Sequence, residues 1–183
     1  MSTSIRGRSV LLRGFRSNEA ERLADLYANM GGARTMSGPV SEQNVRAKVE
    51  ASGTWSDAPW GLILAIDTDG EMVGEIQARG GPSSALPPGV YELGIELYDE
   101  DLRGRGIGTD AVTALTGYLF DEQNANRVQL STDVTNAAMR GAAERAGFRF
   151  EGVMRSYISP REDEPAHDYA LYGRTREDHR NGS

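Results

Sequence analysis

RGRGIG, residues 103–108, is the stretch that decides the fold, because it joins a strand-like run to a helix-like run. Residues 90–97 before it have the composition of a strand, and residues 107–122 after it carry apolar side chains at helical spacing. Glycines permit positive φ and let an anion approach the backbone, and the first N–H groups of a helix have no partners within the helix. The stretch therefore predicts a phosphate-binding loop, to which Arg103 and Arg105 add positive charge.

Three phosphate-binding patterns compete for this loop, and their spacing separates them. A P-loop places four residues between its glycines and ends in Gly-Lys-Ser/Thr, but no lysine follows Gly108. The dinucleotide fingerprint G-x-G-x-x-G requires a glycine where Thr109 stands. The pattern that remains is R-x-x-G-x-G.

This pattern resembles motif A of the GNAT superfamily of acyl-CoA-dependent N-acetyltransferases, which holds the pyrophosphate of coenzyme A. Residues 136–148 are similar to the helix and turn N-x-x-S…E-K-x-G-F of the same family. Residues 150–155 and 168–172 are similar to two strands of its Rim-type branch, which acetylates ribosomal-protein N-termini. The four matches occur in order over residues 90–176, whereas the N-terminal half agrees only in the order of its elements.

The resemblance implies an α/β (α+β) GNAT fold, with a central mixed, mostly antiparallel sheet whose parallel strands splay, flanked by helices. A single domain is expected over residues 1–183, since this length buries a sizeable core. Asp69 and Gly70 between two apolar runs predict a hairpin. The order strand, helix, strand over residues 90–132 predicts a right-handed parallel crossover.

The remaining elements are expected from their local patterns. Residues 10–13 predict a first strand, and Ser17 and Ser41 are expected to cap two helices. These helices should end before residues 31–32 and at Gly53. Residues 80–89 predict a surface loop. Further expected segments are the strands 61–66, 72–77, 127–132, 148–154 and 168–173, and a helix from Asn136 that closes at Gly147.

The resemblance also implies acetyl-CoA as the cosubstrate, bound where the two parallel strands splay apart. Backbone N–H groups around Ile95 and Leu97 would meet the pantetheine arm and the acetyl oxygen. Asn136 would hold the pantetheine arm from the other side. The pyrophosphate would be held by Arg103, Gly104, Arg105, Gly106, Gly108 and Thr109.

A neutral amine that attacks a thioester must pass a proton to a base, but it needs no covalent nucleophile. The two-residue period of a strand places Glu92 and Glu96 on one face. Glu92 is the first choice for the base and Glu96 the second, with an ion pair to a nearby arginine as an equally open role. His167 is a further candidate, although we expect an exposed loop histidine without a fixed partner.

The general acid of the family is missing from its usual positions. Many members carry Tyr seven residues after the motif Asn, where Ala143 stands, and Rim-type members carry Ser three residues after it, where Met139 stands. Water would then protonate the thiolate, or Tyr169 or Tyr172 would, although both are also expected as core aromatics. The departure leaves open a non-catalytic acyl-CoA-binding module. A nucleotide-binding protein that reuses the loop is a third hypothesis, but it leaves the Asn136 helix unexplained.

The composition limits the partners. A net charge of −7 argues against broad nucleic-acid binding. It is the ordinary acidity of many soluble proteins, or else it favours a cationic partner such as an amine acceptor. Two histidines argue against a zinc site, and the absence of cysteine excludes a disulfide framework. Neither a membrane span nor a signal peptide is recognisable, so a cytoplasmic protein is expected. Dimers are common in the family, which leaves a homodimer open. Trp55 and Trp60 are expected to line an acceptor pocket or to cover core edges.

Overall fold

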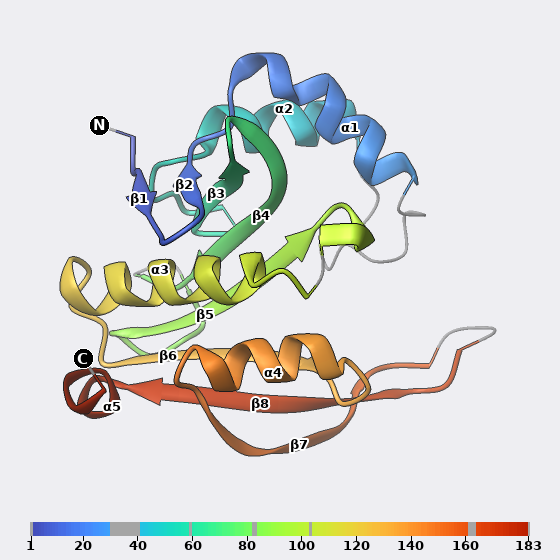
Figure 1. Ribbon diagram of the computed structural model, residues 1–183. Helices are drawn as coiled ribbons and strands as arrows, with labels where there is room; N and C mark the ends of the chain where they lie inside the picture. The colour runs from blue at the N-terminus through green and yellow to red at the C-terminus, as the bar shows by residue number, and fades with distance from the viewer. Residues whose placement is uncertain are drawn as a thin grey trace.

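One eight-stranded sheet runs through the computed structural model, which describes residues 2–29, 41–58, 60–81, 84–102, 104–160 and 164–182. Its strand order is β1-β2-β3-β4-β5-β6-β8-β7 (Figure 1). The strands are β1 (Ile5–Arg6), β2 (Leu11–Arg13), β3 (Leu62–Thr68), β4 (Glu71–Arg79), β5 (Val90–Leu97), β6 (Arg127–Asp133), β7 (Arg149–Ile158) and β8 (His167–Thr175). Among these named strands only β5 and β6 pair in parallel, so the predicted mixed, mostly antiparallel sheet is confirmed.

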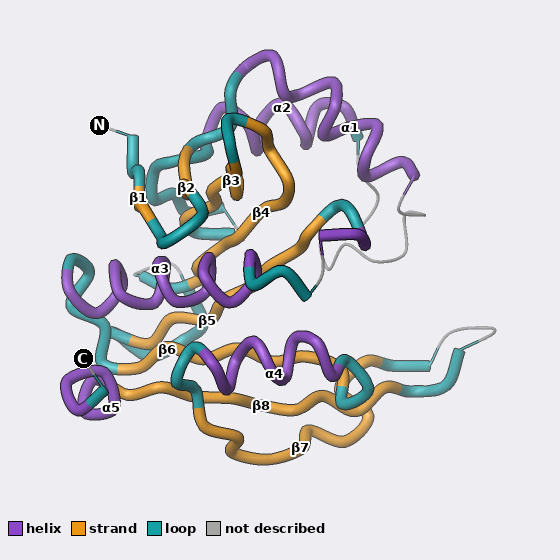
Figure 2. Tube along the Cα trace, viewed as in Figure 1, coloured by secondary structure: helices purple, strands orange, loops and turns teal. Residues whose placement is uncertain are grey.

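The longer helices cover the two faces of this sheet (Figures 1 and 2). They are α1 (Ala20–Asn29), α2 (Glu42–Ala51), α3 (Ile107–Asp121) and α4 (Ala137–Arg145). Three shorter helices are η1 (Ser17–Glu19), η2 (Glu100–Leu102) and α5 (Arg176–Asn181). Within the described ranges, no helix is long and apolar enough to cross a bilayer.

Side chains alternate between the two faces of a strand, so the sheet has one hydrophobic core on each face. The helices pack on these two cores. On one face, Leu23 of α1 and Val45 of α2 pack with Ile63 of β3. On the other face, α3 and α4 pack against side chains that include Leu93 of β5 and Leu130 of β6. The even-numbered residues of β5 therefore point toward the face that carries α1 and α2.

Some of the local predictions agree with the structure and others do not. The hairpin turn has positive φ at Asp69 and Gly70, at 54° and 89°. Ser41 caps α2 by accepting a hydrogen bond from Asn44 N–H at 3.1 Å. Ser17 was wrongly expected as a cap: it lies inside η1, whose N-cap is Arg16. Strand β1 and helix α5 were not predicted.

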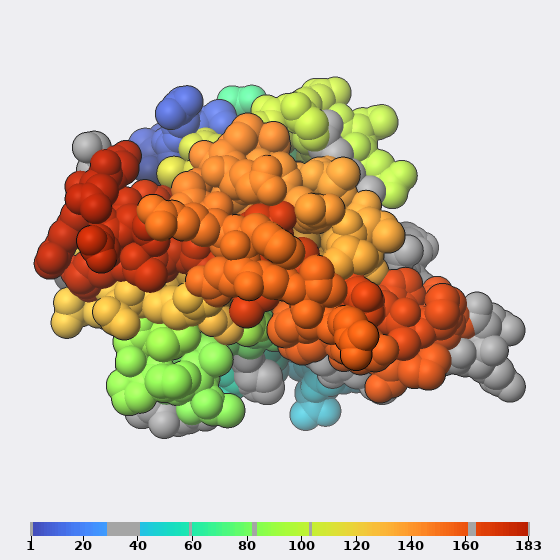
Figure 3. Space-filling view, turned by 90° about the horizontal axis from the view of Figure 1, so that it is seen from below, coloured from blue at the N-terminus to red at the C-terminus, as the bar shows by residue number. Residues whose placement is uncertain are grey.

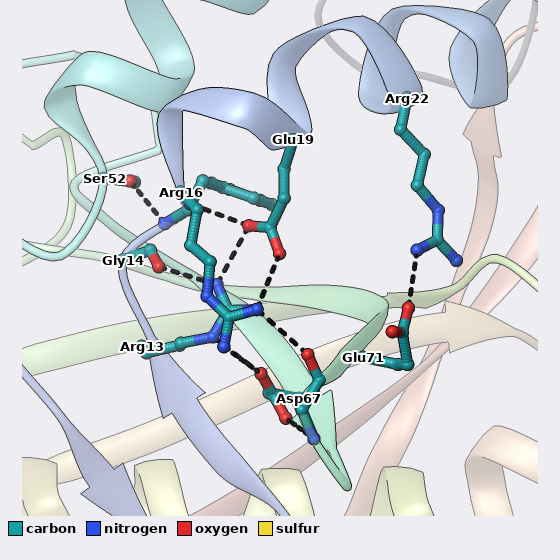
Figure 4. A network of polar contacts seen from close by, with 10 residues as sticks. Arg13, Gly14, Arg16, Glu19, Arg22, Ser52, Asp67 and Glu71 are labelled. Atoms are coloured by element: carbon teal, nitrogen blue, oxygen red, sulfur yellow. Dashed lines mark hydrogen bonds and ion pairs between the residues drawn. The ribbon is translucent and has the colours of Figure 1, made fainter.

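A buried ionic network fastens α1 to the sheet (Figure 4). The Arg13 guanidinium of β2 bonds both oxygens of Glu19, at 2.9 and 2.7 Å, and Oδ2 of Asp67 at 2.7 Å. Burial alone would raise the pKa of Glu19, but hydrogen bonds from the Arg13 side chain and the Arg16 backbone lower it overall. The carboxylate therefore stays ionised in a largely enclosed position, and it ties η1, which leads into α1, to β2 and β3.

The β7–β8 hairpin is longer than predicted and extends as a lobe beyond α4 (Figure 3). Its ladder is irregular between Phe150 and Gly152 and again between Met154 and Ile158. The last β7–β8 pair is Ile158 with His167, and the β6–β8 ladder places the start of β8 beside the end of β6, where Asp133 pairs with Tyr169.

Candidate active site

A gap opens between β5 and β6, both of which lie wholly within the described residues. Their parallel pairing runs from Val90 with Arg127 to Leu93 with Leu130 and then stops. Strand β5 continues alongside β4 as far as Leu97, whereas β6 continues alongside β8 as far as Asp133. The backbone groups of residues 94–97 that face β6 therefore have no strand partner, and the predicted splay is confirmed.

A glycine loop leads from the end of this gap into α3. Gly104 and Gly106 have φ of 79° and 84°, in the left-handed region that favours glycine. Gly106 is the N-cap of α3 without a capping side chain, and the first helical bond joins Asp110 N–H to its carbonyl at 2.9 Å. The N–H groups of residues 107–109 are thus left over at the positive end of the helix, where they can bind an anion.

Space for an anion exists at this helix end. A Cβ placed at Gly104 or at Gly106 would meet nothing within 4 Å. At Gly108, by contrast, a Cβ would lie 3.9 Å from Ile95 Cδ1 and 4.0 Å from Leu97 Cδ1, so the helix start packs on the unpaired end of β5.

The other predicted loop residues differ in their exposure to solvent. Arg105 is exposed beside the helix start, and Thr109 is half-buried in the first turn. Arg103 lies outside the described residues. Of the loop residues that the structure describes, Gly108 is the one for which it gives proximity to Ile95 and Leu97, and the predicted roles of Gly104, Arg105, Gly106 and Thr109 stay predictions.

Asp110 fixes the position of this helix end, and the sequence analysis missed it. Its carboxylate accepts hydrogen bonds from the backbone N–H groups of Arg8, Ser9 and Val10 at 2.9, 2.6 and 3.1 Å, and from the Ser9 hydroxyl at 2.9 Å. Burial opposes the charge, but these donors together lower the pKa of Asp110 below its ordinary value. The first turn of α3 is thereby tied to the turn between β1 and β2.

Asn136 caps α4 on the other side of the gap. Its Oδ1 accepts a hydrogen bond from Met139 N–H at 3.1 Å, and its side chain is exposed at the point where β6 ends. The capping bond gives the residue a structural role, and the predicted contact with pantetheine stays a prediction.

Glu92 points to the face of β5 opposite α3. Its carboxylate forms an ion pair with Arg79 of β4 and accepts a hydrogen bond from the Gln129 amide of β6 at 3.2 Å. Only 18% of its side chain is exposed. The expected alternative role, an ion pair with a nearby arginine, is therefore present, and it fixes the carboxylate where β5 and β6 are still paired.

Glu96 lies four residues after Glu92 on the same face of β5, directly opposite Glu75 of β4. Glu75 is the centre of a polar cluster that the sequence did not indicate. It accepts hydrogen bonds from the Tyr27 hydroxyl, from the Tyr98 hydroxyl at 2.9 Å and from Lys48 Nζ at 2.8 Å. Burial and the nearby Glu75 carboxylate raise the pKa of Tyr27 and of Tyr98, so both hydroxyls remain donors.

The aromatic candidates occupy different surroundings. Tyr172 is fully buried and its hydroxyl lies 3.2 Å from Arg140 Nε and from Glu144 Oε1, so its expected core role is confirmed. Trp55 packs on Tyr91 with 5.5 Å between ring centroids and lines a cavity of about 560 Å³ that also borders Glu92.

Trp60 packs against the core under α1 and α2, whereas Trp55 packs against the core under α3. The two tryptophans therefore pack on different hydrophobic cores.

His167 was expected to lack a fixed partner, and this expectation was wrong. It is the first residue of β8, and its Nδ1 lies 2.7 Å from Oδ2 of Asp133, the last residue of β6. Tyr169, opposite Asp133 in the ladder, packs on Tyr157 at 5.1 Å. Among the described residues no larger group of His, Cys, Asp and Glu gathers as it would around a metal ion.

Residues 9–149 match the family described as "Acetyltransferase (GNAT) domain". The chain belongs to the GNAT acetyltransferase family. Among curated GNAT relatives, a mycothiol acetyltransferase of Paenarthrobacter aurescens is 31% identical over 145 residues, which cover 76% of this chain and 42% of that protein. The chain spans less than half the length of the mycothiol acetyltransferases it matches.

Solved structures show the same GNAT fold over nearly the whole chain. An acetyltransferase of Bacillus anthracis superposes with a TM-score of 0.75 at 20% identity, covering 96% of this chain and 99% of that one. RimJ of Mycobacterium smegmatis, in complex with CoA-disulfide, superposes with a TM-score of 0.72 at 21% identity, covering 97% and 88%. At such identities the likeness shows the fold alone, and membership of the Rim-type branch stays a prediction.

Proposed function

We propose that this protein transfers the acetyl group of acetyl-CoA to a primary amine. The observation that carries the proposal is the gap between β5 and β6, at whose end the uncapped N-terminus of α3 offers free N–H groups. An anionic group at the helix end and an extended arm along the unpaired edge of β5 would satisfy both sets of backbone donors. Coenzyme A carries both features, a diphosphate and a pantetheine arm with amide groups.

The diphosphate would be bound by the loop residues predicted from the sequence. Open space at Gly104 and Gly106 fits close approach of phosphate oxygens to the backbone, and Arg105 adds a cation at the same place. Thr109, Gly108 and Arg103 complete the proposed set. Ile95, Leu97 and Asn136 would border the arm on either side of the gap.

The acceptor would approach from the face that carries α1 and α2. Glu92 and Glu96 of β5 point to this face, and Glu75 adds a third carboxylate beside them. Such a face favours a cationic amine, either a small molecule or the N-terminus of a protein. We propose Glu92 and Glu96 as the catalytic carboxylates that hold the ammonium group. Because Glu92 is ion-paired with Arg79, it would have to leave this arginine to act as the base.

The reaction would proceed by direct attack of the neutral amine on the thioester, with no covalent enzyme intermediate. Backbone N–H groups around Ile95 would stabilise the oxyanion, and the thiolate is a fair leaving group because thiols have a pKa of about 8.5. Membership of the Rim-type branch, a cytoplasmic location and a homodimer stay predictions.

A second candidate function is a module that binds acyl-CoA without catalysis. It is favoured by Met139 and Ala143, which stand where relatives of the family carry a proton donor. Thiol release from acetyl-CoA distinguishes the two functions when it is measured with an alanine-terminated peptide, a polyamine and an aminoglycoside in parallel. Release that depends on one of these amines supports the transferase. Tight coenzyme binding without release in a broad amine panel supports the module.

A further inference from the structure

Asp133 and His167 form a carboxylate–imidazole pair at the open end of the gap. The pair joins the last residue of β6 to the first residue of β8, with 2.7 Å between Oδ2 and Nδ1. Asp133 also accepts hydrogen bonds from the Thr135 hydroxyl at 2.6 Å and the Thr135 N–H at 2.8 Å. These bonds, with a further contribution from His167, lower the pKa of Asp133, so the carboxylate is held ionised and fixed in direction.

The hydrogen bond selects one form of the neutral imidazole. An ionised carboxylate only accepts hydrogen bonds, so Nδ1 carries the proton and Nε2 keeps a lone pair. The His167 side chain remains 40% exposed, which leaves the ring accessible to a ligand. A histidine oriented by a carboxylate through Nδ1 is the arrangement that serves as a general base in many hydrolases and transferases.

The register of the sheet places this pair beside the proposed reaction. The last parallel pair is Leu93 with Leu130, so Asp133 lies three residues beyond it on β6, as Glu96 does on β5. Asp133 and His167 point to the face opposite α3 and α4, because Ala170 and Tyr172, on the alternate positions of β8, are buried in the core under those helices. The pair therefore lies across the gap from the N–H groups of Ile95 to Leu97, on the side from which the acceptor would approach.

We infer that His167 is the general base of the acetyl transfer and that Asp133 is its positioning residue; this inference rests on the proposed function. Nε2 takes one proton from the acceptor ammonium, and the neutral amine then forms the C–N bond to the acetyl carbon. The nitrogen loses its second proton as the C–S bond breaks. The imidazolium returns its proton to the thiolate, so one proton in total passes to solvent. This step also supplies the proton that Met139 and Ala143 cannot donate.

Other ionisable groups lie around the pair. Tyr169 of β8 and Tyr157 of β7 lie next to it, and burial, Asp133 and Tyr157 raise the pKa of Tyr169. Asp168, adjacent in sequence, points to the other face, where it accepts Ser156 N–H at 2.7 Å. Glu96 lies on the same face of the sheet, on the neighbouring strand β5 and opposite Glu75.

The test compares His167→Asn with His179→Asn, which makes the same change at the other histidine of the chain. His179 also lies near a carboxylate, with Nε2 3.1 Å from Asp121 Oδ1, but it stacks on Phe120 at the end of α3. With an amine that supports thiol release, His167→Asn should lower kcat/KM by roughly 10²- to 10⁴-fold near neutral pH. His179→Asn should leave it unchanged.

Two further readouts separate a base from a structural role. The deficit of His167→Asn should shrink as the pH approaches the pKa of the acceptor amine, and imidazole should partly restore His167→Ala. Acetyl-CoA affinity and thermal stability should stay at wild-type values. A His167→Asn variant as active as the wild type, or a deficit constant with pH and not rescued by imidazole, would overturn the inference. If the wild-type protein releases no thiol with any amine, the proposed function itself fails.

Discussion

Replacing Arg13 by methionine tests how the ionic network of Figure 4 holds α1 on the sheet. The side chains of Arg13, Glu19 and Asp67 are 12%, 10% and 5% exposed. Methionine keeps much of the length of arginine but leaves the Glu19 carboxylate without its main cationic partner. Asp67 keeps its ion pair with Arg16, with 3.3 Å between Oδ2 and Nη2, so Glu19 is the carboxylate that mainly loses its ionic partner.

The loss of unfolding free energy in Arg13→Met follows from the burial of the Glu19 carboxylate. Removing one partner of a buried ion pair destabilises a protein by roughly 3–5 kcal/mol, and the remaining Arg16 contact favours the lower end. In a domain of this size each kcal/mol lowers Tm by about 2–4 °C, so Tm should fall by roughly 6–12 °C. Without Arg13, burial would act on Glu19 with less opposition and its pKa would rise.

The matched control is the exposed ion pair in the same figure. Arg22 and Glu71 are 53% and 75% exposed and lie 3.1 Å apart, so Arg22→Met should cost at most about 1 kcal/mol. Thermal and urea unfolding of both variants measure the two costs. If the two variants lose equal stability, the buried network does not fasten α1, and the reasoning is refuted.

Two further variants test the helix end and the acceptor face. Asp110→Asn should lose stability at neutral pH; because the folded pKa of Asp110 is lowered, the difference from the wild type should vanish as pH falls from about 5 through the folded pKa. Urea unfolding at neutral and acid pH measures it, and a difference that persists in acid would contradict the role of the charge. Glu92→Gln should lower kcat/KM for the amine by roughly 10-fold while the pH dependence of the wild type persists. Loss of that dependence would instead make Glu92 the base.

The sequence predicted what is encoded locally. The glycine loop, the start of α3 at Ile107 and the Asp69-Gly70 turn each follow from a few adjacent residues, and the structure has all three. β1 is two residues long and leaves almost no periodic pattern. Ser17 has the chemistry of a cap, but the Glu19 side chain bonds Arg16 N–H at 2.7 Å and moves the helix start by one residue.

The polar clusters around the candidate site could not be predicted, because their members are far apart in the chain. Asp110 is 102 residues from Arg8, Tyr27 is 48 residues from Glu75, and His167 is 34 residues from Asp133. Each is an ordinary surface-type residue in its own segment. Only the pairing of β6 with β8, and the packing of α1 and α3 on the sheet, bring the partners into contact.

Calorimetric titration of acetyl-CoA into the wild-type protein and two glycine variants tests the central claim most directly. Gly106 and Gly70 have φ of 84° and 89°, and a Cβ at either would meet nothing within 4 Å, so replacement by Asp strains both backbones alike. Only Gly106→Asp places a carboxylate at the N-terminus of α3. Loss of one charge-assisted hydrogen bond, about 1.5–3 kcal/mol, predicts at least a roughly 10-fold weaker Kd for Gly106→Asp and an unchanged Kd for Gly70→Asp. No binding heat in the wild type, or a Gly106→Asp variant that binds acetyl-CoA as tightly as Gly70→Asp, would contradict the account.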